Sequence, residues 1–281
     1  MSYNGRKTNI NLHQNLKGIS TQFNHNYTRS DQYRDNNDYK LDSSSINFST
    51  IDDEGVYRYL NLKKFEEDIR LPGGIDLATY FSNPKKTNEP QSFAREELIS
   101  YELGYHDLYI NDIKTNGSIS FSTKQTTSYF DSSWGDSSYR YTYDTLQGYK
   151  KGQLKNNLFN KLSVLNFGVD FYSSDYSDKS LIGSYYKRTA EQTTFDPWLI
   201  GQLFFDHGYN LEAGIRHHFY KLNVYDETTL KQKLHNKSSN VNAWSVGGTK
   251  KIDEKNIFNM KLSKSFRSPK VDEVLHWGGV I

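Results

Sequence analysis

Cysteine is absent from this 281-residue chain, which excludes disulfides, thiolate metal sites and thiol nucleophiles. No apolar run approaches the roughly 18 residues that a transmembrane helix requires. The first residues, Met1–Arg6, lack the basic start and apolar stretch of a signal peptide. If the protein is exported, we therefore expect its leader to lie outside this sequence. A net charge of +2 indicates no polyanionic partner, so we expect no nucleic acid to bind.

Recognisable catalytic motifs are also missing. We find no nucleophile elbow, phosphate-binding loop, zinc-binding helix motif or dinucleotide fingerprint, and Gly247-Gly248 lies within a predicted strand. We therefore expect neither enzyme activity nor a resident cofactor. Helical periodicity is nearly absent, and only Glu89–Leu103 offers a case for a helix.

Aromatic residues and alternating patterns are what the chain does contain. Aromatics make up 15% of the residues, with 22 Tyr, although the mean hydropathy is -0.83. Between residues 209 and 220, apolar side chains alternate with polar ones such as Glu212 and Arg216. Period 2 gives a strand one apolar and one polar face. The length of this run suits the roughly 9–11 residues of a tilted transmembrane strand.

The same hairpin pattern recurs along the whole chain, with about twelve strands joined by alternately short and long connections. We predict strands at 8–16, 19–28, 39–50, 56–64, 98–110, 115–127, 145–159, 163–174, 197–205, 209–224, 240–250 and 256–266. Short turns are predicted at 17–18, 52–55, 111–114, 160–162, 206–208 and 252–255. Outer-membrane barrels place short turns toward the periplasm and long loops outside. The sequence thus predicts an all-β fold, a partial transmembrane antiparallel meander β-barrel.

Four segments, in order, resemble TonB-dependent outer-membrane receptors. Ser30–Asn37 resembles that family's "dGYRdNs" loop, with Gln32 where glycine is usual. Arg70–Gly73 is similar to its "RLPG" segment, Asn210–Tyr220 to its "L..GlRyd.y" strand, and Ser263–Glu273 to its "skgFRaPs.dEl" segment. The family closes a barrel of roughly 22 strands around a plug. The resemblance therefore implies that residues 1–281 are a partial barrel domain, lacking the plug and the C-terminal strands.

The resemblance also implies a function, which is active uptake of a scarce nutrient across the outer membrane. Its commonest cargo is a ferric siderophore, with haem, cobalamin or another metal chelate as alternatives. The expected partners are outer-membrane lipid, the iron chelate and the TonB energy transducer, which acts through the missing plug. Two other functions remain open. One is a small barrel enzyme of the phospholipase type, which needs a His-Ser pair, and the other is an autotransporter or adhesin barrel.

Several residues are candidate binding groups, although the sequence identifies no substrate contact. His217 and His218 are adjacent, but strand alternation sends them to opposite faces, away from a shared metal ion. Glu212 and Arg216 are predicted on the lumen face, where they would line the channel or anchor the plug. Five aspartates, spaced unlike a calcium loop, are interpreted as solvated loop charge, namely Asp107, Asp112, Asp131, Asp136 and Asp144.

Aromatic residues at strand ends allow two interpretations, an interfacial girdle or a vestibule that holds an anionic aromatic chelate by stacking and charge. They are Tyr129, Phe130, Trp134, Tyr139, Tyr141, Tyr143, Tyr185, Tyr186, Phe195 and Trp198. Arg140, Lys187 and Arg188 would supply the charge. Arg267 and Glu273 flank Pro269 in a predicted loop, with roles in stability or in ligand contact equally open.

Overall fold

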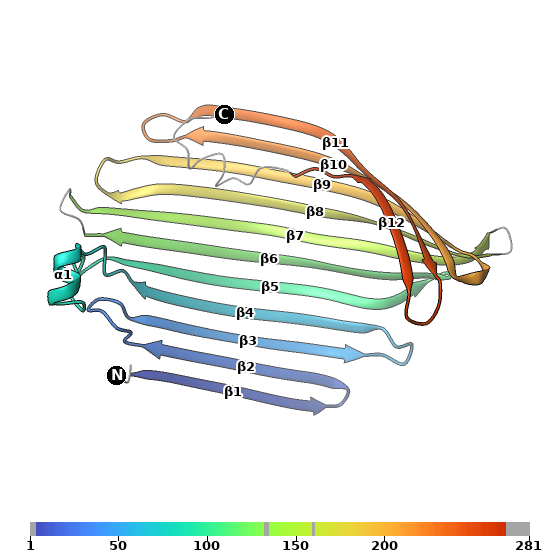
Figure 1. Cartoon of the computed structure of the whole chain (residues 1–281), viewed down its shortest axis with the longest axis horizontal. Coiled ribbons are helices and arrows are strands. Elements are labelled where there is room, and N and C mark those ends of the chain that lie inside the picture. The colour runs from blue at the N-terminus through green and yellow to red at the C-terminus, as the bar shows by residue number, and fades with distance from the viewer. Residues whose placement is uncertain (1–3, 132–134, 159–160, 268–281) are drawn as a thin grey trace.

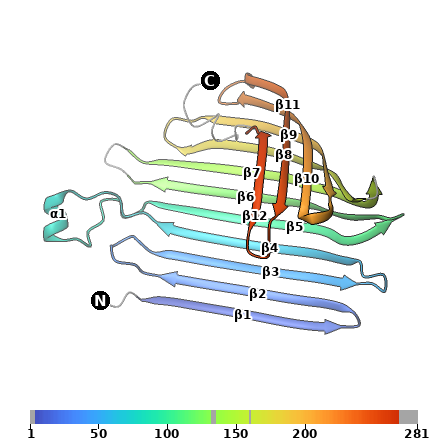
Figure 2. The same ribbon diagram turned by 45° about the vertical axis from the view of Figure 1, so that its right-hand side comes forward.

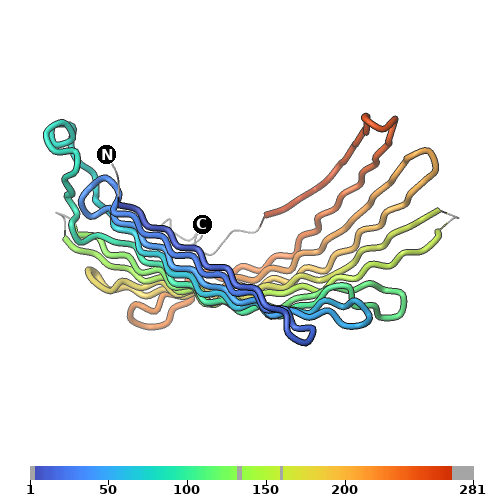
Figure 3. The backbone as a smooth tube through the Cα atoms, turned by 90° about the horizontal axis from the view of Figure 1, so that it is seen from below, coloured from blue at the N-terminus to red at the C-terminus, as the bar shows by residue number. Residues whose placement is uncertain are grey.

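The computed structural model, which describes residues 4–131, 135–158 and 161–267, is one antiparallel sheet of 12 strands in sequence order. The sheet is curved like a trough, and β10–β12 curl around toward its concave side (Figures 1, 2 and 3). The strands are β1 Gly5–Leu16, β2 Ile19–Ser30, β3 Tyr39–Ile51, β4 Tyr57–Arg70, β5 Phe93–Ile110, β6 Ile113–Phe130, β7 Ser137–Leu158, β8 Lys161–Ile182, β9 Lys187–Phe204, β10 Tyr209–Asp226, β11 Gln232–Lys251 and β12 Ile257–Lys264.

The predicted alternation decides which side chains face outward. In β10, Leu211 and Ile215 are each 53% exposed, whereas His218 and Tyr220 on the other face are buried. Cross-strand partners share a face, so the register extends this pattern over the whole sheet. One outward row is apolar from β1 to β7, and it consists of Leu12, Phe23, Ile46, Leu62, Tyr101, Phe121 and Leu146.

On the later strands the outward apolar band continues closer to the short turns. There Phe167, Leu199, Ile215 and Trp244 are cross-strand neighbours. A band that crosses the strands obliquely is expected when strands tilt by about 35–45° to the barrel axis. The partial transmembrane-type meander predicted from the sequence is therefore the observed fold.

The described turns lie where they were predicted, at one end of the sheet, while the long connections gather at the other end (Figure 1). Lys17-Gly18, 52–56, 111–112, 205–208 and 252–256 join neighbouring strands. The predicted turn at 160–162 lies partly outside the described residues. Positive φ angles at Lys17, Gly18 and Gly208 allow the chain to reverse tightly, which glycine tolerates best.

The predicted strand ends were wrong at the end of the sheet that carries the long loops, which we call the loop end. There the observed strands are longer than predicted. Segments 128–144, 175–196 and 225–239 were predicted as loops, yet β7 begins at Ser137, β8 ends at Ile182 and β11 begins at Gln232. These segments lack an apolar face because they extend beyond the apolar band. Backbone pairing, which does not depend on hydrophobicity, holds them in the sheet.

The helix considered for Glu89–Leu103 was also wrong, because β5 starts at Phe93 and pairs with β4 and β6. The sheet offers partners on both sides, which outweighs a weak local preference. The one helix among the described residues is α1, Leu77–Ser82, whose N-cap Asp76 accepts a hydrogen bond from the Thr79 N–H. No described helix has the length and apolar character to cross a membrane.

Candidate functional site

The concave face carries an ion cluster centred on the buried Asp196 in β9. Its Oδ1 lies 2.6 Å from His218 Nδ1, and its Oδ2 accepts a hydrogen bond of 3.1 Å from Arg216 Nε. Asp170 in β8 lies 3.3 Å from the same guanidinium. Charges taken out of water are tolerated only when paired. Three neighbouring strands are thereby joined by one charged network.

Phe266, just beyond β12, covers this cluster. Its ring lies 4.4 Å from the ring of His218, at 33° between planes. Phe266 belongs to the segment that resembles "skgFRaPs.dEl", and His218 to the one that resembles "L..GlRyd.y". The two motifs therefore meet on the concave face, which neither motif alone indicates. Ser268–Glu273, including Pro269, lie outside the described residues.

The structure confirms the predicted sheet faces of the β10 side chains. Glu212 and Arg216 both lie on the concave face, but they have separate partners. Glu212 accepts from Gln202 Nε2 at 2.8 Å, and Lys261 Nζ is 3.8 Å away. His217 and His218 diverge as predicted, with His217 Nδ1 lying 2.5 Å from Asn242 Oδ1. The role of Glu212 and Arg216 in holding a plug stays a prediction.

A cavity of about 640 Å³ lies beside the ion cluster. Its charged lining consists of Asp170, Lys151, Arg216, Lys261 and Lys264. Tyr149 and Trp198 add aromatic walls, and Lys151 Nζ is 5.7 Å from the Tyr149 ring centroid. With one carboxylate against the concave-face cations Lys151, Arg216 and Lys261, this cavity suits an anionic, partly aromatic molecule. Sequence reasoning missed Asp170, Asp196 and Lys151 because they lie on different strands.

Nearer the long loops, tyrosines form the buried core of the concave face. Tyr143 and Tyr176 have ring centroids 4.5 Å apart, and Tyr176 packs with Ala190, Tyr220, Leu222 and Val224. Tyr186 Oη donates to Asp178 at 3.0 Å. Burial, with the nearby Asp178 carboxylate, raises the pKa of Tyr186. These hydroxyls therefore stay protonated hydrogen-bond donors at neutral pH.

The predicted aromatic set divides between the two faces. Tyr139, Tyr141, Tyr143 and Trp198 lie on the concave face, which fits the vestibule interpretation. Phe195 lies outward against Phe219, with centroids 6.1 Å apart, and fits the girdle. The alternation of β6 places Phe130 on the concave side and Tyr129 outward, where Tyr129 donates to Asp136 at 2.9 Å. Tyr185 is 59% exposed, and Trp134 lies outside the described residues.

Of the three predicted cations, only Arg188 lies on the concave face. Its Nε is buried without a hydrogen-bond partner among the described residues, and Asp178 and Asp226 are its cross-strand neighbours. Arg140 faces outward, and Lys187 Nζ pairs with Glu227 at 2.5 Å. That lysine holds the pKa of Glu227 down at about 2. These three residues therefore do not together form the cationic part of the vestibule predicted for an anionic chelate, and other cations gather around the cavity.

Clusters of potential metal ligands are absent from the described residues. Within residues 4–131, 135–158 and 161–267, no group of three or more His, Asp or Glu side chains is close enough to hold a metal ion. Asp107 instead pairs with Lys114 at 2.7 Å. Asp131 contributes only its backbone N–H, which donates to Ser92 Oγ at 2.8 Å.

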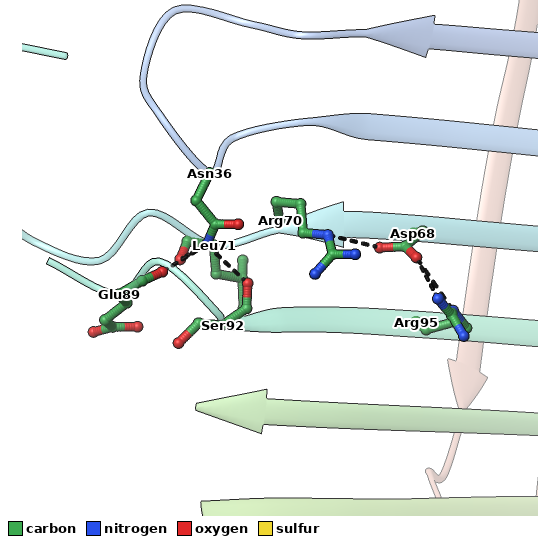
Figure 4. Close-up of polar contacts among 7 residues, drawn as sticks. All are labelled: Asn36, Asp68, Arg70, Leu71, Glu89, Ser92 and Arg95. Carbon is green, nitrogen blue, oxygen red and sulfur yellow. Dashed lines mark hydrogen bonds and ion pairs between the residues drawn. The ribbon is translucent and has the colours of Figure 1, made fainter. Parts of the chain in front are cut away.

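Two of the recognised motifs form a loop lock, which we define as Arg34 and Asn36 with the carbonyl groups they bind. Figure 4 shows the Asn36 part of the loop lock. Arg34 donates to the Gly73 carbonyl at 2.7 Å and to the Lys86 carbonyl at 2.8 Å. The Asn36 amide donates to the carbonyls of Glu89, Leu71 and Ser92 at 2.6, 3.1 and 3.1 Å. The 30–37 segment thus ties down the long β4–β5 connection.

Backbone geometry in the loop lock explains the unusual residue noted in the sequence. Gln32 has a φ of 45° and Gly73 a φ of 66°. That left-handed region favours glycine, so the family pattern has glycine where this chain has Gln32. At Gly73 a side chain would also collide, because an added Cβ would lie 2.7 Å from Glu89 Cδ.

Replacing Asn36 by alanine is expected to loosen the β4–β5 connection by about 1–3 kcal/mol, because buried carbonyls lose their donor. Trypsin cleavage after Lys85 and Lys86 in the folded protein should then rise roughly 5- to 150-fold. Asn37→Ala, one residue away and outside the loop lock, is the control. Equal cleavage rates in the two variants would refute a locking role for Asn36.

Comparison with known proteins supports the fold. No protein-family model matches the sequence, and no curated protein matches it. Among solved structures, the ferric citrate transporter FecA in its unliganded form is similar, with a TM-score of 0.86, 13% identity, and cover of 99% of this chain and 45% of that chain. The open form of the ferric-catecholate import receptor Fiu of E. coli K12 is also similar, with a TM-score of 0.77 and 11% identity. The match covers 94% of this chain and 53% of that chain.

The copper transporter OprC gives a TM-score of 0.77 at 13% identity, with cover of 97% of this chain and 45% of that chain. These likenesses establish the fold, that of part of an outer-membrane receptor barrel. The chain spans about half the length of the solved structures it matches.

Proposed function

We propose that this chain forms part of the wall of an outer-membrane receptor that imports a metal chelate of the ferric siderophore class by TonB-driven transport. One observation carries the proposal. A curved sheet bears an apolar band on its convex face and a charged, aromatic lining on its concave face. Lipid outside and a wet channel inside require that arrangement. The similar proteins named above are a ferric citrate transporter, a ferric-catecholate import receptor and a copper transporter.

We further propose that residues 1–281 are a partial barrel domain. In the described sheet, β1 and β12 each pair on one side only, and open edges invite aggregation. About ten more strands would close a barrel of receptor size around a plug that reaches TonB. The flanking coding sequence tests this. A plug on one side and further amphipathic strands on the other support it, and tight stop codons on both sides would refute it.

On the concave face, the proposal assigns chemistry to particular residues. Lys151, Arg216 and Lys261 around the 640 Å³ cavity would attract an anionic chelate, and Trp198 and Tyr149 would stack on its ligand rings. The Asp196 cluster fixes the Arg216 guanidinium in place. No residue in this arrangement is poised to break a bond, and we propose no catalytic role.

Lys151 provides the sharpest test of the import proposal, because its neighbour Lys150 is on the opposite face. Lys151→Gln should reduce uptake of a radiolabelled ferric chelate roughly 3- to 10-fold, through lost electrostatic attraction. The measurement uses cells that lack other receptors for that chelate, normalised to the amount of folded protein in the outer membrane. Lys150→Gln should leave uptake unchanged.

The same assay checks the energy source. Uptake should vanish in cells without TonB while binding to the cell surface persists. A panel of ferric siderophores, haem, cobalamin and copper complexes would identify the cargo. If no member of the panel is taken up, the receptor proposal fails. If Lys150→Gln and Lys151→Gln are equally impaired, only the assignment of the cavity fails.

A further inference from the structure

Three cations stand side by side on the outward face at the loop end of β1–β3. Arg6 is the direct cross-strand partner of Arg29, and Arg29 is the direct partner of Lys40. All three are exposed. Directly opposed side chains in a sheet have Cβ atoms about 4.5–5.5 Å apart, and like charges in such positions are destabilising. We name these three residues the basic row.

Acidic partners within the protein do not neutralise the basic row. Arg29 Nε lies 3.6 Å from Asp31 Oδ1, between side chains that are 59% and 45% exposed. Among the described residues, neither Arg6 nor Lys40 has an ion pair within 4.0 Å. Asp42, two residues along β3 from Lys40, lies 3.6 Å from His25, and Asp68, the cross-strand partner of Lys40, pairs with Arg95 at 2.7 Å. The basic row therefore keeps a net positive charge.

The line of direct cross-strand partners that contains the basic row includes an acidic residue on the next strand, β4. On β4 and β5 it continues as Asp68 and Arg95, which pair at 2.7 Å, and Arg70 lies 3.6 Å from Asp68 (Figure 4). That part of the line carries its own counter-charge. Asp68 thus supplies counter-charge on β4 and β5, whereas the basic row has no comparably close ion pair. Farther along the same line, Arg140 on β7 and Lys179 on β8 are again adjacent cations.

The height of the basic row matches a membrane boundary. Arg29 lies ten residues beyond Ile19, the first residue of β2 at the short-turn end. At about 3.4 Å per residue and a tilt of about 40°, those residues rise about 26 Å. The apolar band of an outer-membrane barrel is about 25 Å tall. Six residues along each strand, Leu12, Phe23 and Ile46 form the apolar row on the same face.

From this placement we infer that the basic row binds the phosphate groups of an anionic lipid in the leaflet at the loop end of the sheet. Guanidinium groups match phosphate oxygens in paired hydrogen bonds, and basic residues near a membrane surface attract anionic lipid. The lipid's acyl chains would lie along Leu12, Phe23 and Ile46. The lipid site is on the face opposite the import path and does not depend on the identity of any cargo.

The test purifies the protein as the cell makes it and measures retained lipid by native mass spectrometry. Wild type should retain a phosphate-bearing glycolipid. Rebinding in nanodiscs should favour bis-phosphorylated lipid A over the same lipid without phosphates. The variant Arg6→Gln/Arg29→Gln/Lys40→Gln should lose lipid roughly tenfold or more. Excess inorganic phosphate should not displace the lipid, because it lacks the acyl chains.

The matched control is Lys7→Gln/Lys17→Gln/Lys63→Gln, which removes the same charge at exposed positions outside the basic row. It should retain lipid like wild type. Equal loss from both triple variants would show a general charge effect and overturn the inference. So would absence of retained lipid in a correctly folded wild type, or no preference for the phosphorylated lipid.

Discussion

Replacing Asp196 by alanine should destabilise the protein by about 1–3 kcal/mol, the cost of removing the hydrogen-bond partner of a buried polar group. Asp196 is 5% exposed and His218 is 4% exposed. The carboxylate serves both His218 and Arg216, so its loss removes the partner of the buried His218 Nδ1 and one of the two carboxylates beside Arg216. Urea unfolding of the purified protein in detergent, followed by tryptophan fluorescence and heat-dependent gel mobility, measures the change.

Two further variants sharpen this result. Asp196→Asn keeps the size and one acceptor oxygen, so it should lose less stability than the alanine variant. Asp206, which pairs with Lys161, is the exposed control, with a side chain 74% exposed. Asp206→Ala should change stability little, because exposed ion pairs contribute little. If Asp196→Ala were no more harmful than Asp206→Ala, the cluster would not hold the three strands together.

The second large effect is expected at Gly168, where a methyl group has no room. A Cβ there would lie 2.7 Å from the Lys150 carbonyl oxygen and 2.7 Å from Trp198 Cζ2. The Trp198 ring therefore lies over the bare backbone of the adjacent strand. Gly168→Ala should cost about 1–3 kcal/mol through overpacking and lower the yield of folded barrel. The same urea titration measures it.

Gly201→Ala is the matched control, because a Cβ at that position has only Leu165 Cδ1 within reach, at 4.0 Å. It should be close to neutral. Trp198→Leu combined with Gly168→Ala should relieve the ring contact but leave the contact with the Lys150 carbonyl oxygen. Partial recovery in the double variant separates the two contacts. A Gly168→Ala protein as stable as Gly201→Ala would contradict the close approach.

The predicted strands were too short because their ends were placed where apolar alternation stops. Polar segments such as 137–144 and 175–182 carry no apolar face, so alternation stops although pairing continues. The helix at Leu77–Ser82 was missed because its main signal is a single capping contact, Asp76 to Thr79. Glu89–Leu103 looked helical because local spacing is weak evidence when neighbouring strands compete for the same backbone.

The candidate site was predicted only in part for a related reason. Alternation placed Glu212 and Arg216 on the concave face, because the side-chain period is a local property. Their partners lie on other strands, and register alone brings Asp170, Asp196 and His218 together. Arg140, Lys187 and Arg188 seemed equivalent in sequence, yet strand parity sends only Arg188 inward.

The sequence by itself determined an antiparallel meander with one lipid-type face, because period-2 alternation and alternating loop lengths can be read from residues that are close together in the chain. Only the tertiary structure decided which charges meet. The Asp196 cluster, the loop lock and the basic row each join residues from separate strands or loops. Their proximity follows from register and curvature, which arise when every backbone group of the sheet finds its partner.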